Sequence, residues 1–113
     1  MASYKTELTG DFDTVMDKLH SAILAQSTSA SFEDGVRYTS GDVRVEVRVY
    51  ERYSAFGGNR VSMTVTLCGT GRQLFLSGIT SGGSQAMFFK LNTVGEDNFL
   101  ETLVRAARAL PEC

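Results

Sequence analysis

The sequence predicts an α+β fold: a single antiparallel β-sheet of five or six strands, in the chain order β-α-β-β-β-β-(β)-α, with two helices packed on one face. Two observations predict it. Segments of alternating apolar and polar residues follow one another through the middle of the chain, joined by short glycine-containing turns. Segments with apolar residues at three- and four-residue steps flank them. The length of 113 residues indicates one domain over 1–113.

The first strand and the first helix come from the N-terminal part of the chain. Tyr4, Thr6 and Leu8 alternate with polar residues and predict a half-buried strand that Gly10 ends. Asp11 is placed to cap the helix that follows. That helix is predicted over 12–26 from its apolar stripe, which consists of Phe12, Val15, Met16, Leu19, Ile23 and Leu24.

The clearest pattern is the segment 43–53, VRVEVRVYERY, which predicts a strand with valines on one face and charged residues with Tyr50 on the other. A strand around 32–38 precedes it, and a strand over 60–68 follows it. We expect segments 43–53 and 60–68 to pair as antiparallel neighbours. We expect their apolar side chains to be buried beneath the helices, namely Val45, Val47, Val65 and Leu67.

The C-terminal part holds a fifth strand, an ambiguous segment and a second helix. Segment 73–80, QLFLSGIT, is partly apolar on both faces, so we expect it either to be buried on both faces or to bulge at Gly78. Segment 84–92 fits a sixth strand or a short helix, and the strand is favoured. The pattern over 96–110 predicts a helix that Pro111 stops.

This order of elements resembles the helix-grip and TATA-binding-protein-like folds, in which a curved antiparallel sheet supports a C-terminal helix. The ending TSGGSQAMFFKLNTVGEDNFLETL and the opening YKTELTGDFD resemble a small bacterial family of proteins of this length, described only as a domain of unknown function. The resemblance covers the whole chain and implies a bacterial source. Its motifs are glycine and aromatic positions, so it assigns no functional residue.

Composition argues against several classes of partner and compartment. The formal charge of −2 argues against nucleic acid, because binding to phosphates needs a clustered positive surface. No apolar run has the length of a signal peptide or a membrane span, so we expect no membrane partner. Two cysteines are too few for a disulfide framework. These features predict a cytoplasmic protein.

The residues that catalysis would need are sparse. His20 is the only histidine, and it lies at the margin of the first helix's apolar stripe, which is typical of a structural residue. Cys68 belongs to a serine and threonine series, and Cys113 is the last residue, so both are predicted to be plain thiols. The His and Cys spacings match no zinc pattern, and no nucleophile elbow is present. We therefore expect no metal and no cofactor, and we rank an enzyme last.

The arginines of segment 43–53 form the one cluster that indicates binding. Residues 37–72 carry six arginines against three carboxylates, whereas residues 1–36 are acidic. We expect the polar sheet face, with its threonines, to stay free for a second copy in a homodimer, a protein partner or a small anionic ligand. Its residues are Arg44, Arg48, Tyr50 and Arg52. In one dimer these arginines meet the acidic first turn of the first helix; a solvated ladder of ion pairs is the structural alternative.

The second hypothesis is a carrier of a small apolar ligand. It places a cavity between the sheet and the C-terminal helix. The lining residues would be Met63, Phe75, Phe88 or Phe89, and Phe99. Side chains of these types also form ordinary protein cores.

Overall fold

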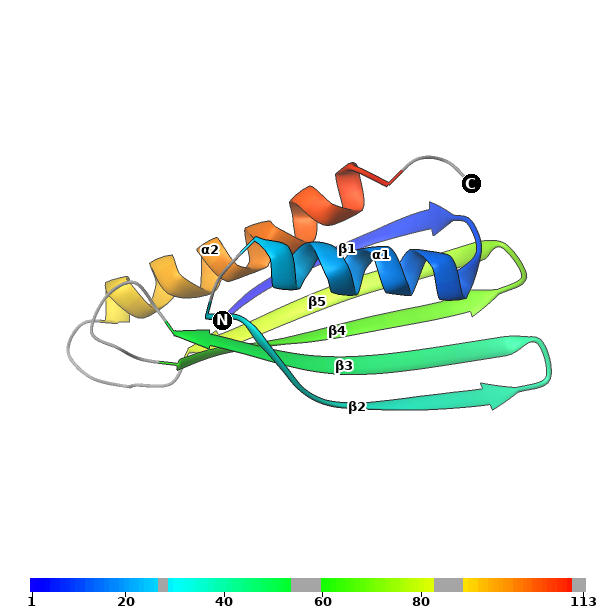
Figure 1. Cartoon of the computed structure of the whole chain (residues 1–113), viewed down its shortest axis with the longest axis horizontal. Coiled ribbons are helices and arrows are strands. Elements are labelled where there is room, and N and C mark those ends of the chain that lie inside the picture. The colour runs from blue at the N-terminus through cyan, green and yellow to red at the C-terminus, as the bar shows by residue number, and fades with distance from the viewer. Residues whose placement is uncertain (27–28, 54–59, 83–88, 111–113) are drawn as a thin grey trace.

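A computed structural model describes residues 1–26, 29–53, 60–82 and 89–110. Five antiparallel strands form one sheet in the order β1-β5-β4-β3-β2 (Figure 1). In the sequence, one helix follows the first strand and the other follows the last strand, which confirms the predicted α+β class. The elements are β1 (Ala2–Thr9), α1 (Phe12–Ala25), β2 (Ser31–Ser40), β3 (Val43–Tyr53), β4 (Arg60–Thr70), β5 (Gln73–Gly82) and α2 (Phe89–Arg108).

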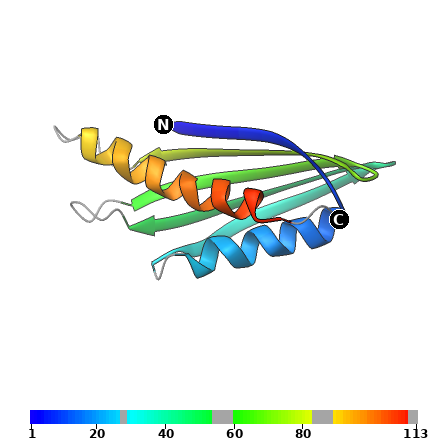
Figure 2. The same ribbon diagram turned by 90° about the horizontal axis from the view of Figure 1, so that it is seen from above.

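Both helices lie on the same face of the sheet, which we call the helix face (Figure 2). Helix α1 begins as predicted, because the Asp11 carboxylate accepts a hydrogen bond of 3.0 Å from the backbone N–H of Thr14. The same carboxylate accepts a second bond of 2.9 Å from the Thr14 hydroxyl. These two bonds lower the pKa of Asp11. The cap therefore holds the helix start beside the end of β1.

Helix α2 is longer than the sequence pattern indicates. It begins at Phe89 rather than 96, so the predicted sixth strand over 84–92 is wrong for residues 89–92, and residues 84–88 lie outside the described residues. The helix continues through Gly95. A single glycine costs a helix only about 1 kcal/mol relative to alanine, which packing against a sheet readily offsets.

The core lies between the helices and strands β4 and β5. Every second residue of β4 from Val61 to Leu67 is fully buried, and the helix-face residues of β5 are buried with them. Two glycines let the helices approach: a Cβ on Gly69 would lie 3.0 Å from Phe12 Cδ2, and a Cβ on Gly78 would lie 2.2 Å from Leu103 Cδ2. Strand β5 keeps a regular register at Gly78, so it has no bulge there, and Phe75 and Ile79 are exposed, so it is not buried on both faces either; both predicted alternatives are wrong.

The valines of β3 lie on the opposite side of the sheet from their predicted position. Val65 and Leu67 are buried beneath the helices as expected, but Val47 pairs with Thr66, while Arg48 pairs with Val65. Directly paired residues share a face, so Val45 and Val47 point away from the helices. A slip of one residue in register exchanges the two faces of a strand. The six-residue connection 54–59 leaves that register undetermined in the sequence.

The other two hairpins have tight turns that do determine their register. Strands β2 and β3 are joined by Gly41 and Asp42, and strands β4 and β5 by Gly71 and Arg72. The two glycines have φ of 57° and 58°, the left-handed backbone that such two-residue turns require at their first position.

The helix layer covers only part of its face. Helices pack about 8–10 Å apart, so two helices cover roughly 20 Å, whereas five strands span roughly 24 Å. The helices pack on β1, β5 and β4, and strands β3 and β2 extend past α1 (Figure 1). The helix face of β3 therefore lies at the margin of the core, where long polar side chains reach back towards α1.

Candidate functional site

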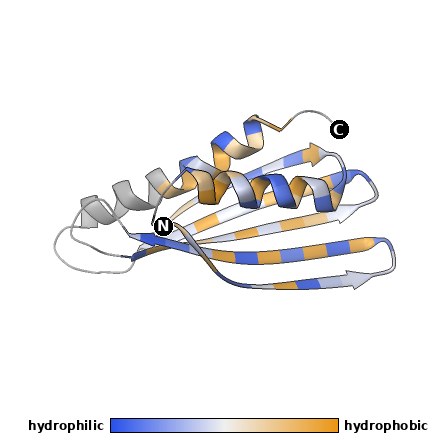
Figure 3. Ribbon diagram, in the orientation of Figure 1, coloured by the Kyte–Doolittle hydropathy of each residue, from blue (hydrophilic) through white to orange (hydrophobic). Residues whose placement is uncertain are grey.

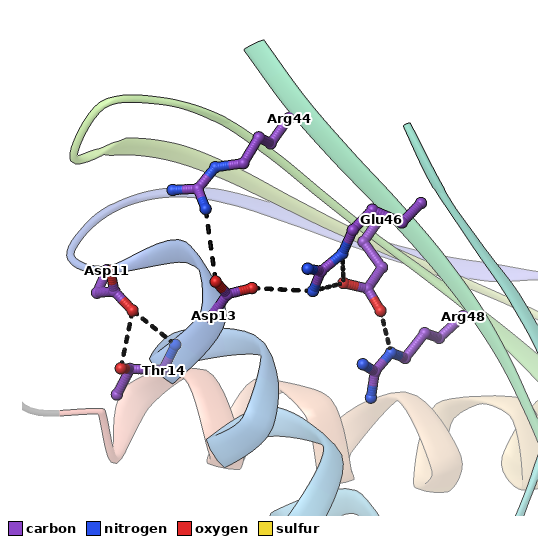
Figure 4. Close-up of polar contacts among 7 residues, drawn as sticks. Asp11, Asp13, Thr14, Arg44, Glu46 and Arg48 are labelled. Atoms are coloured by element: carbon purple, nitrogen blue, oxygen red, sulfur yellow. Dashed lines mark hydrogen bonds and ion pairs between the residues drawn. The ribbon is translucent and has the colours of Figure 1, made fainter. Parts of the chain in front are cut away.

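The first candidate site is a polar cluster on the helix face of β3. Strand alternation places Arg44, Glu46, Arg48, Tyr50 and Arg52 on this face. Figure 4 shows three of them: Arg44 reaches Asp13 in the first turn of α1, and Arg48 reaches Glu46 of its own strand. The predicted site residues of β3 therefore do share one face, but this face is the one that carries the helices.

Glu46 is the centre of the cluster and is nearly buried. Its Oε1 accepts hydrogen bonds of 2.9 and 2.5 Å from Nε and Nη2 of Arg37, and its Oε2 accepts one of 2.6 Å from Nε of Arg48. Burial alone would raise the pKa of Glu46, but the bonds from the two arginines outweigh it and lower the pKa. The carboxylate is therefore held in its charged form between two guanidinium groups.

Asp13 links this cluster to the helix. Its carboxylate lies 2.9 Å from Nη2 of Arg37 and 3.5 Å from Nη1 of Arg44 (Figure 4). The guanidinium groups of Arg37 and Arg44 also lie over the ring of Phe12, at 5.6 and 4.8 Å. The acidic helix turn and the basic strand, considered above as partners between two copies, thus meet within one chain.

An aromatic group continues the cluster along β3. The Tyr50 ring is fully buried, and its hydroxyl is joined by a hydrogen bond of 2.8 Å to Nδ1 of His20. The ring of Phe32 lies 5.6 Å from that of His20 and 5.7 Å from that of Tyr50. Burial, with the positive charge of Arg48 nearby, lowers the pKa of His20, and burial raises the pKa of Tyr50. His20 is thus a partly buried residue, as its position at the margin of the apolar stripe predicts.

The chemistry available to this cluster is limited. A shallow depression of about 390 Å³ opens beside it, and His20, Phe32, Arg37 and Arg48 contribute to its walls. The two arginines already hold Glu46, so an anionic ligand would have to compete with that carboxylate. The described residues contain no group of three or more His, Cys, Asp or Glu side chains that could hold a metal ion. The cluster is built as an internal ion-pair network, although a role in anion binding stays a prediction.

The remaining predicted residue of this face, Arg52, lies near α2. Its guanidinium is 4.9 Å from the centre of the Phe99 ring, and burial lowers its pKa. The predicted combination of arginines and threonines on one free face is wrong. The register places Thr64 and Thr66 opposite Val49 and Val47, on the other side of the sheet.

The second candidate site is that other side, which we call the open face. Neither helix packs on it (Figure 2). Along β3 it carries the valines, whose alternation with charged residues is visible in Figure 3. On β2 the exposed fractions are 64% for Val36 and 65% for Tyr38, and on β5 they are 42% for Phe75 and 47% for Ile79. Large apolar side chains therefore reach solvent on β2, β3 and β5, while β4 contributes threonines, a serine and Cys68 to this face.

The middle of the open face carries no charge. The register aligns its residues in three rows across β5, β4, β3 and β2, and the last row ends in a charged residue, Asp34, at the edge strand β2. The rows are Phe75, Cys68, Val45 and Tyr38; Ser77, Thr66, Val47 and Val36; and Ile79, Thr64, Val49 and Asp34. Cys68 thus lies among threonines, as the sequence pattern predicts, and its thiol is partly exposed.

Most of these residues are absent from the predicted sites, although the sequence carries a signal for them. Segment 73–80 is apolar on both faces, which requires a second apolar surface besides the core. Val36 and Tyr38 repeat the alternation of the valines that they pair with. The prediction places the valines of β3 in the core, and with them there the sequence pattern does not indicate that the other face of the sheet is apolar.

The described residues of the predicted ligand cavity lie on two different faces of the sheet. Met63 and Phe99 are fully buried in the core, but Phe75 points to the open face, on the other side of the sheet. The close contact of Leu103 with Gly78 brings α2 directly onto β5. Phe88 lies outside the described residues, as does the side chain of Phe89. Of the described residues, Met63 and Phe99 therefore share the core and Phe75 does not line a cavity with them.

Comparisons with known proteins identify the chain by family. Within the described residues, neither helix is long and apolar enough to cross a membrane. A search of curated proteins finds no significant match, and a search of solved structures also finds none. The model of a family of unknown function, DUF6054, matches residues 1–111. The chain therefore belongs to this family of unknown function, as its opening and its ending suggest.

Proposed function

We propose that the protein is a non-catalytic, protein-binding module whose binding surface is the open face of the sheet. The observation that carries this proposal is that the two faces of the sheet differ: the chain's own helices pack on one face, while large apolar side chains are exposed on the other. Contiguous exposed apolar surfaces of folded proteins are typical of interaction sites.

The distribution of polarity over the open face supports the same function. Protein interfaces have an apolar centre that is depleted in charge and a polar rim. On the open face, charged residues stand at the edges, with Lys5 and Glu7 on β1 and Asp34 on β2. Valines, threonines and aromatic residues occupy the centre.

The helix-face cluster supports this function less well. Arg37, Arg44 and Arg48 are matched by carboxylates of the same chain, at Glu46 and Asp13. A binding surface formed by this cluster would have to break these pairs. The open face offers contact area without that loss.

The proposal is tested by photo-crosslinking in living cells of the organism that encodes the chain. A photoreactive phenylalanine analogue replaces Thr66, at the centre of the open face, and a matched variant carries it at Ser21, on the exposed side of α1. We expect a discrete covalent adduct with a protein from the Thr66 variant and none from the Ser21 variant. Absence of an adduct at Thr66, or the same adducts from both variants, would rule out the open face as the binding surface.

A further inference from the structure

We infer that the partner of the open face is a second copy of this chain, bound face to face about a two-fold axis. This inference rests on the proposed function, because it uses the same surface. Three properties of the molecule lead from an unspecified protein partner to a second copy: the charge of the face, its area and its shape.

The charge of the open face suits a second copy. When a surface packs on itself, every charged residue near the axis meets its own equivalent, and like charges repel. On β5, β4 and β3 the three central rows of the open face contain no charged residue, and Asp34 ends one row at the edge strand β2. The formal charge of the whole chain is only −2, so repulsion between two copies is weak. A partner selected by charge, in contrast, would find no charged group at the centre of this face.

The area of the open face suits a stable dimer. Strands about 4.8 Å apart, each about ten residues long with a rise of about 3.3 Å per residue, give the five-stranded sheet a face of roughly 800 Å². A stable protein interface buries about 800 Å² on each partner. One such face is thus large enough to hold two copies together without any contribution from the helices.

The shape of the surface fits the packing of one sheet on another. β-branched residues occupy most central positions, with Val45, Val47 and Val49 on β3 beside Thr64 and Thr66 on β4. Two sheets that pack face to face lie about 10 Å apart and interdigitate side chains of this kind. In a two-fold dimer the same patch serves both copies, so each contact occurs twice. The dimer would then have the four layers helix, sheet, sheet, helix.

Sedimentation velocity of the purified full chain over a concentration series tests this inference. We expect the wild type to sediment at twice the chain mass of 12.3 kDa at micromolar concentrations, with no dependence on salt. Thr66→Glu and Thr66→Lys each place a like charge on both sides of the axis and should sediment as folded monomers. Ser21→Glu is the matched control on α1 and should remain dimeric.

Mixing the two charged variants adds a result specific to a symmetric contact. Opposite charges then face each other across the axis, so we expect the mixture of Thr66→Glu and Thr66→Lys to associate at least about tenfold more tightly than either variant alone. A merely damaged surface would not recover on mixing. Thiol labelling supplies a second measurement: in a Cys113→Ser background, the reaction rate of Cys68 should fall as the concentration rises and the face is covered.

The outcomes separate the two proposals. A wild type that is monomeric at all concentrations overturns the second copy, and so does a Thr66→Glu variant that dimerises as the wild type does, because that dimer would use a strand edge or the helices. An adduct of the in-cell Thr66 crosslink with a different protein, combined with a monomeric purified chain, overturns the second copy and leaves the proposed function standing. Absence of any adduct removes the proposed function itself.

Discussion

Strands β3 and β4 lie side by side, yet their apolar residues point to opposite faces of the sheet. On β4 the apolar series from Val61 to Leu67 is buried under the helices, and the threonines face outwards. On β3 the valines face outwards, and the helix face carries arginines, a glutamate and Tyr50. Alternation thus indicates that a strand has two different faces, but the position of the helices decides which face is buried.

The helix face itself also has two halves. Over β4 and β5 it is apolar and filled by the two helices, with α2 in direct contact with Gly78. Over β3 and β2 it lies beyond α1, and long side chains close the gap by ion pairs with Asp13 and Glu46. Arginine suits this margin because its alkyl stem covers the apolar edge of the core while its guanidinium reaches a carboxylate.

The largest expected difference in stability is between two variants, one with an aspartate on the helix face and one with an aspartate on the open face. Val65→Asp buries a charge in the core, which costs several kcal/mol of the ~5–15 kcal/mol that a domain has, so this variant should be unfolded. Val47→Asp lies on the open face and should lower the free energy of unfolding by only about 1 kcal/mol, because aspartate is a poor strand former. Circular dichroism during thermal unfolding in dilute solution measures both. If Val47→Asp is also unfolded, the valines belong to the core and the open face is assigned wrongly.

The second effect compares a buried and an exposed carboxylate of the ion-pair network. Glu46→Gln removes the charged acceptor that Arg37 and Arg48 share, and it should lower the free energy of unfolding by about 1–3 kcal/mol. Asp13→Asn removes a carboxylate whose side chain is 52% exposed and should cost about 0–1 kcal/mol. Urea unfolding of the two variants provides the measurement. Equal losses would contradict the central position of Glu46.

The smallest effect concerns His20 and pH. The pKa of His20 is lower in the folded chain than its ordinary value of 6.5, so the unfolded chain binds a proton more readily. The free energy of unfolding should therefore be constant above pH 6.5 and decrease as the pH falls towards the folded pKa. Melting temperatures of the wild type and of His20→Gln over this pH range provide the test. We expect a smaller pH dependence in the variant, and an identical dependence would assign the effect to other groups.

The polar cluster was only partly predictable. The spacing of Arg44, Arg48 and Arg52 on one face follows from strand alternation alone, and the structure confirms that spacing. The partners of these residues come from elsewhere in the chain: Asp13 and His20 from α1, and Phe32 and Arg37 from β2. No local pattern relates these segments, because their distance in space depends on how α1 lies across the sheet.

Local chemistry by itself determined the fold class and most element boundaries. The Asp11 cap, the apolar stripe of α1 and the glycine turns at Gly41 and Gly71 each act over a few residues, so they are legible in the sequence. The tertiary structure alone decided three features: the start of α2 before Gly95, the close contact at Gly78 and the face on which the valines of β3 lie. The contact at Gly78 and the face of the valines depend on segments distant in the chain. The valines follow from the register across residues 54–59, where a shift of one residue would exchange the buried face with the open one.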